Sequence, residues 1–434
     1  MSSSLIGLIG IAILFVLLFL RVPIAFAMGL VGFAGFVVLG GFEGASSVLA
    51  MIPYRTVTSY HFAVIPLFVL MGTLATNSGI TRDLYYSMHK WVGHFRGGLA
   101  TATVFACGSF AAITGSAMAG TVTMGKIVAP EMRRYHYDHK LIAGCVAAGG
   151  TLGVLIPPSM GFILYGILTE ESIGQLFMAG VIPGILEIVF YVVVIFILCR
   201  INPAIGPASN KATLNEKLKS LVNILPVIAL FGLVMGGIYG GIFTPTEAGA
   251  MGAFGALVIG LIMRRLSGKD FVKSFSESVQ ISAQVVIIII CAFIFAAFMT
   301  LSRLPFILAE IIVGLSLPPF AILAIILIVY ILLGCAFDLM SLIIITVPII
   351  FPLVVNLGFD PIWYGVLMVR VMEMGAITPP IGLNSYVLAG IMDVPVGTVF
   401  RGIVPFVIAD IIHIAVLAAI PQISLFLPTM MIRG

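Results

Sequence analysis

Charged residues are scarce in this chain. Only 9% of its 434 residues are Asp, Glu, Lys or Arg, while 61% are hydrophobic. Soluble domains carry about 25% charged residues, so this scarcity excludes a soluble enzyme or binding module. The apolar runs instead fit helices of about 20 residues, which predicts an all-α polytopic membrane protein in contact with membrane lipid. The net charge of +4 comes from short basic loops, and we expect no nucleic-acid partner.

Paired cysteines and catalytic motifs are also lacking. The five cysteines stand singly in apolar segments, so no spacing indicates zinc, an iron–sulfur cluster or a disulfide framework. The chain contains no His-Glu-x-x-His and no Gly-x-Ser-x-Gly, and its polar loops are too short for a catalytic domain. We therefore expect no enzyme. The run 5–20 has no basic region before it, which favours a retained membrane helix over a signal peptide.

Two apolar runs, 99–130 and 320–355, are too long for one crossing. Small or polar residues interrupt each run near its middle. Thr114-Gly115-Ser116 interrupts the first, and the stretch from Gly334 through Asp338 to Ser341 interrupts the second. We expect each run to be a re-entrant hairpin of two half-helices that enters the membrane and returns.

Two other apolar runs, 140–168 and 362–392, each contain a Pro-Pro pair, at residues 157–158 and 379–380. A Pro-Pro pair removes two N–H donors and clashes with the preceding turn, so each helix should break there. At membrane depth, broken backbone is tolerated only where protein or a water-lined cavity satisfies it. Broken helices in matching positions of two repeats indicate a transporter binding site.

The order of these segments predicts two repeats, at 61–200 and 265–434. Each would contain a crossing helix, a short linking helix, a hairpin, a broken helix and a final crossing, which in the second repeat is the run 399–427. Residues 1–60 would form N-terminal scaffold helices, and residues 201–264 a cytoplasmic loop with connecting helices. Basic residues mark the cytoplasmic side and flank only the first hairpin, so the hairpins should enter from opposite faces and the repeats should be inverted.

The four interruptions also predict cation sites. A hard cation such as Na⁺ favours several oxygen ligands, and carbonyls supply them without adding charge. Broken helices and hairpin tips both leave carbonyls without N–H partners. Kinking for packing alone is the alternative interpretation. We expect two Na⁺ sites, the first built from the backbone oxygens of Ala111, Gly153, Ile156 and Pro158, and the second from those of Gly334, Gly375, Thr378 and Ile381, with the Thr378 hydroxyl as a further candidate ligand.

Several charged residues lie within apolar runs, where charges are costly and are functional by default. Arg370 and Glu373 have the i, i+3 spacing of an ion pair. Arg370 either binds an anionic substrate in bidentate fashion or locks its helix together with Glu373 near the outer interface. Asp338 either caps the returning half-helix or balances a cation. Asp410 and His413, one turn apart, form either a hydrogen-bonded pair or a proton relay.

Four stretches together resemble the large membrane subunit of the tripartite ATP-independent periplasmic (TRAP) transporter family. They occur in the family's order and span most of the chain. Within the third, Thr244 and Glu247 also predict a capping box for the next helix, with direct substrate contact as the alternative role. The stretches are Thr114-Gly115-Ser116 with Pro130-Glu131-Met132, residues 149–159 (GGTLGVLIPPS), residues 244–250 (TPTEAGA) and residues 373–384 (EMGAITPPIGLN).

The resemblance implies a Na⁺-driven elevator-type importer in the bacterial inner membrane, in which a transport domain holding both hairpins slides against a static scaffold. Its implied partners are a small four-helix membrane subunit, a periplasmic substrate-binding protein and a small organic acid anion, either carboxylate or sulfonate. The sodium sites of the family coincide with those expected above. The predicted substrate contacts are Thr114, Gly115, Ser116, Asp338, Arg370 and Asn384.

One departure from the family is visible at the first hairpin tip. The family often has Ser-Gly-Ser-Ser there, and this chain has Thr114-Gly115-Ser116-Ala117, which keeps the first hydroxyl and loses the last. The loss should alter substrate contacts. The alternative function is a proton-coupled anion transporter or antiporter that uses no binding protein. Such a carrier would place carboxylates or histidines at the membrane midplane, where this chain offers carbonyls and hydroxyls.

Overall fold

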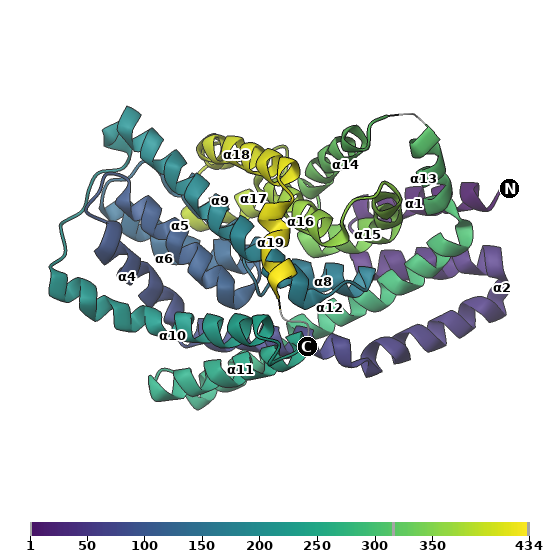
Figure 1. Ribbon diagram of the computed structural model, residues 1–434, viewed down its shortest axis with the longest axis horizontal. Helices are drawn as coiled ribbons and strands as arrows, with labels where there is room; N and C mark the ends of the chain where they lie inside the picture. Colours follow the sequence, from purple (N-terminus) through teal and green to yellow (C-terminus); the bar gives the residue numbers. More distant parts are fainter. Residues whose placement is uncertain (1, 315–316, 432–434) are drawn as a thin grey trace.

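The computed structural model describes residues 2–314 and 317–431, and all regular structure within them is helical. Nine helical segments of the described residues are long and apolar enough to cross a membrane. The all-α polytopic class predicted from composition is therefore confirmed. Figure 1 shows the helices side by side in a wide body, with the two chain ends at different places on it.

The N-terminal helices are α1 (Ser3–Phe19) and α2 (Ile24–Thr58). Helix α2 continues to Thr58, beyond the apolar stretch that ends near residue 41. Gly41 has a φ of +77°, which kinks α2 into two helical parts at the point where hydrophobicity falls. Figure 1 shows α2 turning back on itself at this kink.

The next elements follow the predicted order of the first repeat, and the long run 99–130 is indeed two helices. The run 140–168 is likewise broken in two at its Pro-Pro pair. The elements are η1 (Tyr60–Ala63), α3 (Val64–Asn77), α4 (Ile80–Val92), α5 (Gly98–Thr114), α6 (Ala117–Arg134), α7 (His139–Leu155), α8 (Met160–Thr169) and α9 (Ile173–Ile201).

The connecting segment contains η2 (Pro203–Ile205), α10 (Leu214–Tyr239) and α11 (Pro245–Ile262). The predicted capping box at the start of α11 is confirmed. The Thr244 hydroxyl accepts the Glu247 backbone N–H at 3.3 Å, and the Glu247 carboxylate accepts the Thr244 backbone N–H at 2.8 Å. These bonds satisfy N–H groups that the first turn of a helix leaves free.

The helices from Gly268 to Met430 follow the order predicted for the second repeat. The prediction of one final crossing at 399–427 is wrong, because the chain breaks at Ile420 before Pro421, a residue that disfavours helix in its predecessor. The elements are α12 (Gly268–Ser302), α13 (Leu304–Gly314), α14 (Pro319–Gly334), α15 (Leu339–Asn356), α16 (Pro361–Ile377), α17 (Leu383–Met392), α18 (Val396–Ala419) and α19 (Gln422–Met430).

Two helices, α7 and α16, form the centre of the molecule. Every residue of α7 from Leu141 and of α16 from Ile362 to its end is buried. Helix α7 packs against α5, α6 and α18, and α16 packs against α14, α15 and α18. In Figure 1, α5 and α6 lie on one side of α16, and α14 and α15 lie on the other. The first half of each broken helix therefore sits beside its own helix pair.

Candidate functional site

Four breaks in helical structure lie at residues 115–116, 156–159, 335–338 and 378–382. Gly115 adopts φ +60°, and a side chain there would meet the Pro158 carbonyl, since an ideal Cβ would lie 2.5 Å from that oxygen. Only glycine fits this close approach of the first break to the second. Both Pro-Pro bonds are cis.

Side-chain caps begin three of the helices that follow these breaks. The Ser116 hydroxyl accepts the Ala119 N–H at 3.4 Å, the Ser159 hydroxyl accepts the Phe162 N–H at 3.3 Å, and the Asp338 carboxylate accepts the Ser341 N–H at 3.1 Å. Asp338 also accepts the Ser341 hydroxyl. The capping role that the sequence predicts for Asp338 is thus confirmed, and it fixes the start of α15.

A pocket of about 100 Å³ lies where all four breaks meet. It is lined by the first residues of α6, α8, α15 and α17 and by residues in the last turns of α7 and α16. Its lining residues are Gly115, Ser116, Ala117, Met118, Val154, Met160, Asp338, Leu339, Met340, Ala376, Leu383 and Asn384. The pocket therefore joins segments from both halves of the chain.

The electrostatics of this pocket favour an anion. A helix N-terminus carries about half a positive charge and exposes free N–H groups, and four such ends reach the pocket. Asn384 is 3% exposed, and its Nδ2 donor has no hydrogen-bond partner among the residues that the structure describes. A buried unpaired donor is costly, so an acceptor brought by a ligand would satisfy it. Asn384 was placed among the substrate contacts from the sequence, and the structure puts it in the pocket lining.

The first set of predicted cation ligands surrounds the meeting point of the first two breaks. Gly153 faces the Ser116 carbonyl, since an ideal Cβ on Gly153 would lie 2.8 Å from that oxygen. Pro158 approaches Gly115 as described above. Ile156 ends α7 in extended conformation, and the Ala111 carbonyl accepts the Gly115 N–H at 3.1 Å. The C-terminal ends of α5 and α7 are thus adjacent, and both carry partial negative charge.

The second set lies at the equivalent meeting point. Gly375 touches Gly334, because an ideal Cβ on Gly375 would lie 2.8 Å from the Gly334 Cα. The Thr378 hydroxyl donates to the Met374 carbonyl at 2.6 Å, which leaves its oxygen lone pairs able to accept or to ligate. Ile381 is 44% exposed. Among the described residues, no group of His, Cys, Asp and Glu could hold a metal ion, so any cation here would bind main-chain and hydroxyl oxygens.

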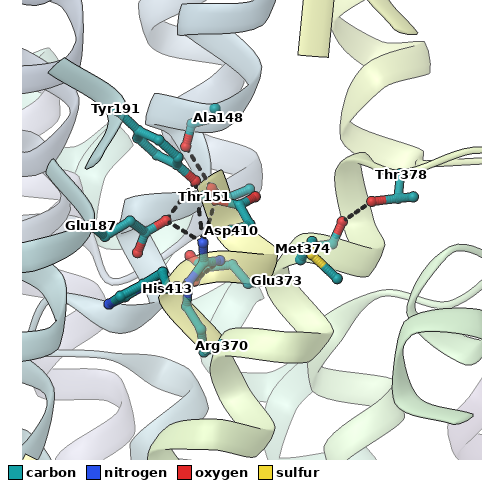
Figure 2. Close-up of polar contacts among 10 residues, drawn as sticks. All are labelled: Ala148, Thr151, Glu187, Tyr191, Arg370, Glu373, Met374, Thr378, Asp410 and His413. Atoms are coloured by element: carbon teal, nitrogen blue, oxygen red, sulfur yellow. Dashed lines mark hydrogen bonds and ion pairs between the residues drawn. The ribbon is translucent and has the colours of Figure 1, made fainter. Parts of the chain in front are cut away.

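Arg370, on α16, does not line the pocket and belongs to a separate cluster of fully buried side chains. Figure 2 shows its guanidinium between side chains of α9 and α18. Its Nη2 lies 2.5 Å from Asp410 Oδ1 and 3.1 Å from Glu187 Oε1, and its Nη1 lies 3.7 Å from Glu373 Oε2. Its Nε donates to His413 Nδ1 at 3.1 Å.

This buried ion cluster (Glu187, Tyr191, Arg370, Glu373, Asp410 and His413) joins the two halves of the chain. Arg370 on α16 contacts Glu187 on α9 and Asp410 on α18, so its ion pairs tie α9 of the first half to α16 and α18 of the second. Within α9, the Tyr191 hydroxyl donates to Glu187 at 2.6 Å. All six side chains of the cluster are 0% exposed. Closely paired charges of this kind hold helices in one arrangement, since breaking a pair leaves a buried uncompensated charge.

Comparison with known proteins decides the family. Residues 11–423 match the family described as "Tripartite ATP-independent periplasmic transporter, DctM component". The chain belongs to the DctM family. The resemblance seen in its sequence motifs is thereby confirmed, and as a DctM-family protein with nine apolar spans in its described residues it is a multi-pass protein of the bacterial inner membrane.

Characterised relatives in the DctM family are transporter permeases. The chain is 37% identical to the C4-dicarboxylate TRAP transporter large permease protein DctM of Pseudomonas aeruginosa, over 89% of this chain and 93% of that protein. It is 30% identical to the sialic acid TRAP transporter large permease protein SiaM of Vibrio cholerae, over 99% and 98%. The fold resembles the crystal structure of the Alcanivorax borkumensis YdaH transporter, with a TM-score of 0.67 and 15% identity over 88% of this chain and 89% of that one.

Within this DctM-family fold, the predicted substrate residues separate into two groups. Gly115, Ser116, Asp338 and Asn384 line one pocket. Thr114 does not line it, and its hydroxyl donates to the Phe110 carbonyl at 3.2 Å. Arg370 does not line it either, and its burial among carboxylates favours the helix-locking interpretation that the sequence left open.

Sequence reasoning missed Glu187 and Tyr191. The available signal was a lone carboxylate in the middle of the apolar helix Ile173–Ile201, which is a functional or paired position by default. The predicted pair of Asp410 with His413 needs correction as well. Each contacts Arg370, and no hydrogen bond joins the two side chains to each other in the described part of the chain. These contacts join residues of α9, α16 and α18 that are far apart in the sequence, and the spacing of residues within one helix does not predict them.

Proposed function

We propose that this protein imports a small organic acid anion across the inner membrane by coupling it to Na⁺. The observation that carries the proposal is the meeting of four helix N-termini and the unpaired Asn384 donor in one pocket. N–H groups and helix dipoles are the main-chain means of binding an anion. The matched relatives are permeases for C4-dicarboxylate and for sialic acid, both organic acids.

The cation half of the proposal rests on the opposite helix ends. Each break that begins a helix at the pocket also ends one, at Thr114, Leu155, Gly334 and Ile377. Helix C-termini carry partial negative charge and free carbonyls, which suit a cation. We propose one Na⁺ at Ala111, Gly153, Ile156 and Pro158, and a second at Gly334, Gly375, Thr378 and Ile381. Anion and cations would then bind on the two sides of the same breaks and stabilise one arrangement together.

The partners and the movement complete the proposal. A small four-helix membrane subunit and a periplasmic substrate-binding protein would assemble with this chain, as the names of its TRAP relatives suggest for those systems. The two helix pairs α5–α6 and α14–α15 would be re-entrant hairpins entering from opposite faces. With α7–α8 and α16–α17 they would form a transport domain that moves as an elevator. Residues 1–60 and the connecting helices α10 and α11 would remain as scaffold.

The test is uptake into proteoliposomes that hold the chain and its small subunit, with the cognate binding protein outside. We expect accumulation of labelled organic acid under an inward Na⁺ gradient and none when K⁺ replaces Na⁺. Uptake driven by a pH gradient alone, without Na⁺ or binding protein, would support the proton-coupled alternative instead. A chain that accumulates no organic acid under any gradient would overturn the transport assignment for this pocket.

A further inference from the structure

The polarity of the pocket at the four breaks narrows the class of substrate. We propose that this pocket selects a singly charged acid with a short apolar body, and that it discriminates against dianions and against polyhydroxylated acids. This inference rests on the proposed anion transport and goes beyond it, because the two relatives described above are named for a dicarboxylate and for sialic acid.

The charge that the pocket offers matches one anionic group. None of its lining residues is Lys, Arg or His. Its positive potential comes from the four helix N-termini, which together contribute about two positive charges, and Asp338 removes one of these. About one positive charge remains. Asn384 Nδ2, a buried side-chain donor with no hydrogen-bond partner among the described residues, is available to that anionic group.

The cations do not change this balance. The four helix C-termini at the same breaks carry about two negative charges together, which is what two Na⁺ ions would neutralise. The fully buried cationic side chain of Arg370 lies outside the pocket lining and is already surrounded by Asp410, Glu187 and Glu373. A second carboxylate on the substrate would therefore enter the pocket without a counter-charge, and burying an unpaired charge is costly.

The walls of the pocket match an apolar body. Beyond Ser116, Asp338 and Asn384, the lining consists of glycine, alanine, valine, leucine and three methionines, Met118, Met160 and Met340. The Ser116 hydroxyl already accepts the Ala119 N–H, and the Asp338 carboxylate already accepts two groups of Ser341. Substrate hydroxyls would thus lose their bonds to water with few partners in return. Methionine side chains adapt to irregular apolar shapes.

The experiment compares three acids that share a four-carbon skeleton. Butanoate has one charge, succinate has two, and 2,3-dihydroxybutanoate has one charge and two added hydroxyls. Binding to the purified complex of this chain with its small subunit, in the presence of Na⁺, is measured by calorimetry and by the shift in the unfolding temperature of the complex. We expect butanoate to bind about tenfold or more tightly than either of the others, because an apolar pocket discriminates against an added hydroxyl by up to about a hundredfold.

Two variants test the two halves of the argument. Asp338→Asn keeps the helix cap, since Asn caps as well as Asp, but removes the charge, and should raise the affinity for succinate about tenfold. Asp360→Asn is its matched control. Asp360 caps α16 by accepting the Trp363 N–H at 2.9 Å and lies outside the pocket, so this substitution should leave the affinities for succinate and butanoate unchanged.

The second pair of variants tests the polarity of the pocket walls. Met340→Gln should reduce the ratio of butanoate affinity to 2,3-dihydroxybutanoate affinity. The exposed Met51→Gln should not.

The outcomes separate this inference from the function on which it depends. Sodium-driven uptake together with succinate binding as tight as butanoate binding would overturn the inference and leave the transport proposal standing. A permease that takes up no acid at all would overturn both. If none of the three compounds binds, the identity of the acid that the permease transports decides. Transport of a monoanion with an apolar body supports the inference, and transport of a dianion or a polyhydroxy acid overturns it.

Discussion

The buried ion cluster and the pocket share helix α16, the first half of a broken helix, but they hold charge in different ways. In the cluster, three carboxyl groups on α9, α16 and α18 lie within 3.7 Å of the Arg370 guanidinium, and all four side chains are 0% exposed. In the pocket, partial charges of helix ends face a cavity and one donor is left unpaired.

The difference indicates a division of labour. Full charges that are paired in an apolar core are costly to separate, so they suit a permanent connection between helices. Partial main-chain charges bind an ion without such a large cost on release, so they suit a ligand that must leave again. We interpret the cluster as the joint that keeps α9, α16 and α18 together and the pocket as the site that fills and empties.

The largest expected effect comes from breaking the cluster. Arg370→Met should destabilise the protein by about 3–5 kcal/mol, because three buried carboxyl groups lose their common partner. Thermal unfolding of the purified protein and its recovery from the membrane measure this effect. Arg370→Lys, which keeps the charge but loses the fork geometry, should fall between wild type and Arg370→Met. An unchanged unfolding temperature in Arg370→Met would show that the cluster does not hold the helices.

A substitution in the pocket should lower the affinity for substrate and leave the stability of the protein nearly unchanged. Asn384→Ala should weaken substrate binding by about 1.5–3 kcal/mol, the value of a hydrogen bond to a charged group, and should leave stability nearly unchanged because its Nδ2 has no partner to lose. The measurement is substrate affinity beside unfolding temperature. Asn77→Ala is the control, since Asn77 donates to Ser274 and Glu277 at the α3–α12 contact and should affect stability only. Equal substrate affinity in wild type and Asn384→Ala would remove Asn384 from the site.

The cation side of the breaks gives a smaller effect. Thr378→Val removes one hydroxyl from the proposed second Na⁺ site and should raise the Na⁺ concentration for half-maximal uptake several-fold. Thr378→Ser, which keeps the hydroxyl, should behave like wild type. The readout is the Na⁺ dependence of uptake at fixed substrate. If Thr378→Val and Thr378→Ser show the same Na⁺ dependence, the hydroxyl is not a ligand.

The smallest effect should come from a region that belongs to neither site. Thr244→Ala removes one side-chain cap of α11 and should cost about 1 kcal/mol of stability with no change in substrate or Na⁺ affinity. The check is a lower unfolding temperature beside unchanged uptake constants. A change in substrate affinity would assign this loop to the transport site, contrary to its purely structural role here.

The sequence anticipated the breaks because their cause is local. A Pro-Pro pair at residues 157–158 or 379–380 stops a helix in any surroundings, because it removes two N–H donors. Gly115 marks a turn because glycine adopts positive φ without steric cost. The capping of α15 by Asp338 and of α11 by Thr244 also depends on residues three apart, and both were predicted. The split at Ile420 was missed because a weaker local signal, a single proline, decided it.

Composition and the positions of its prolines alone determined that this is a helical membrane protein with four interrupted segments, because hydrophobic length and proline act on a segment whatever its neighbours are. Its motifs carried a resemblance to the TRAP family, and the comparison with known proteins showed the family itself. Only the tertiary structure decided which side chains meet. It placed Asn384 beside Ser116 and Asp338, and it placed Arg370 among Glu187, Asp410 and Glu373. Contacts between residues far apart in sequence depend on how the helices pack, and no periodicity within one helix carries that information.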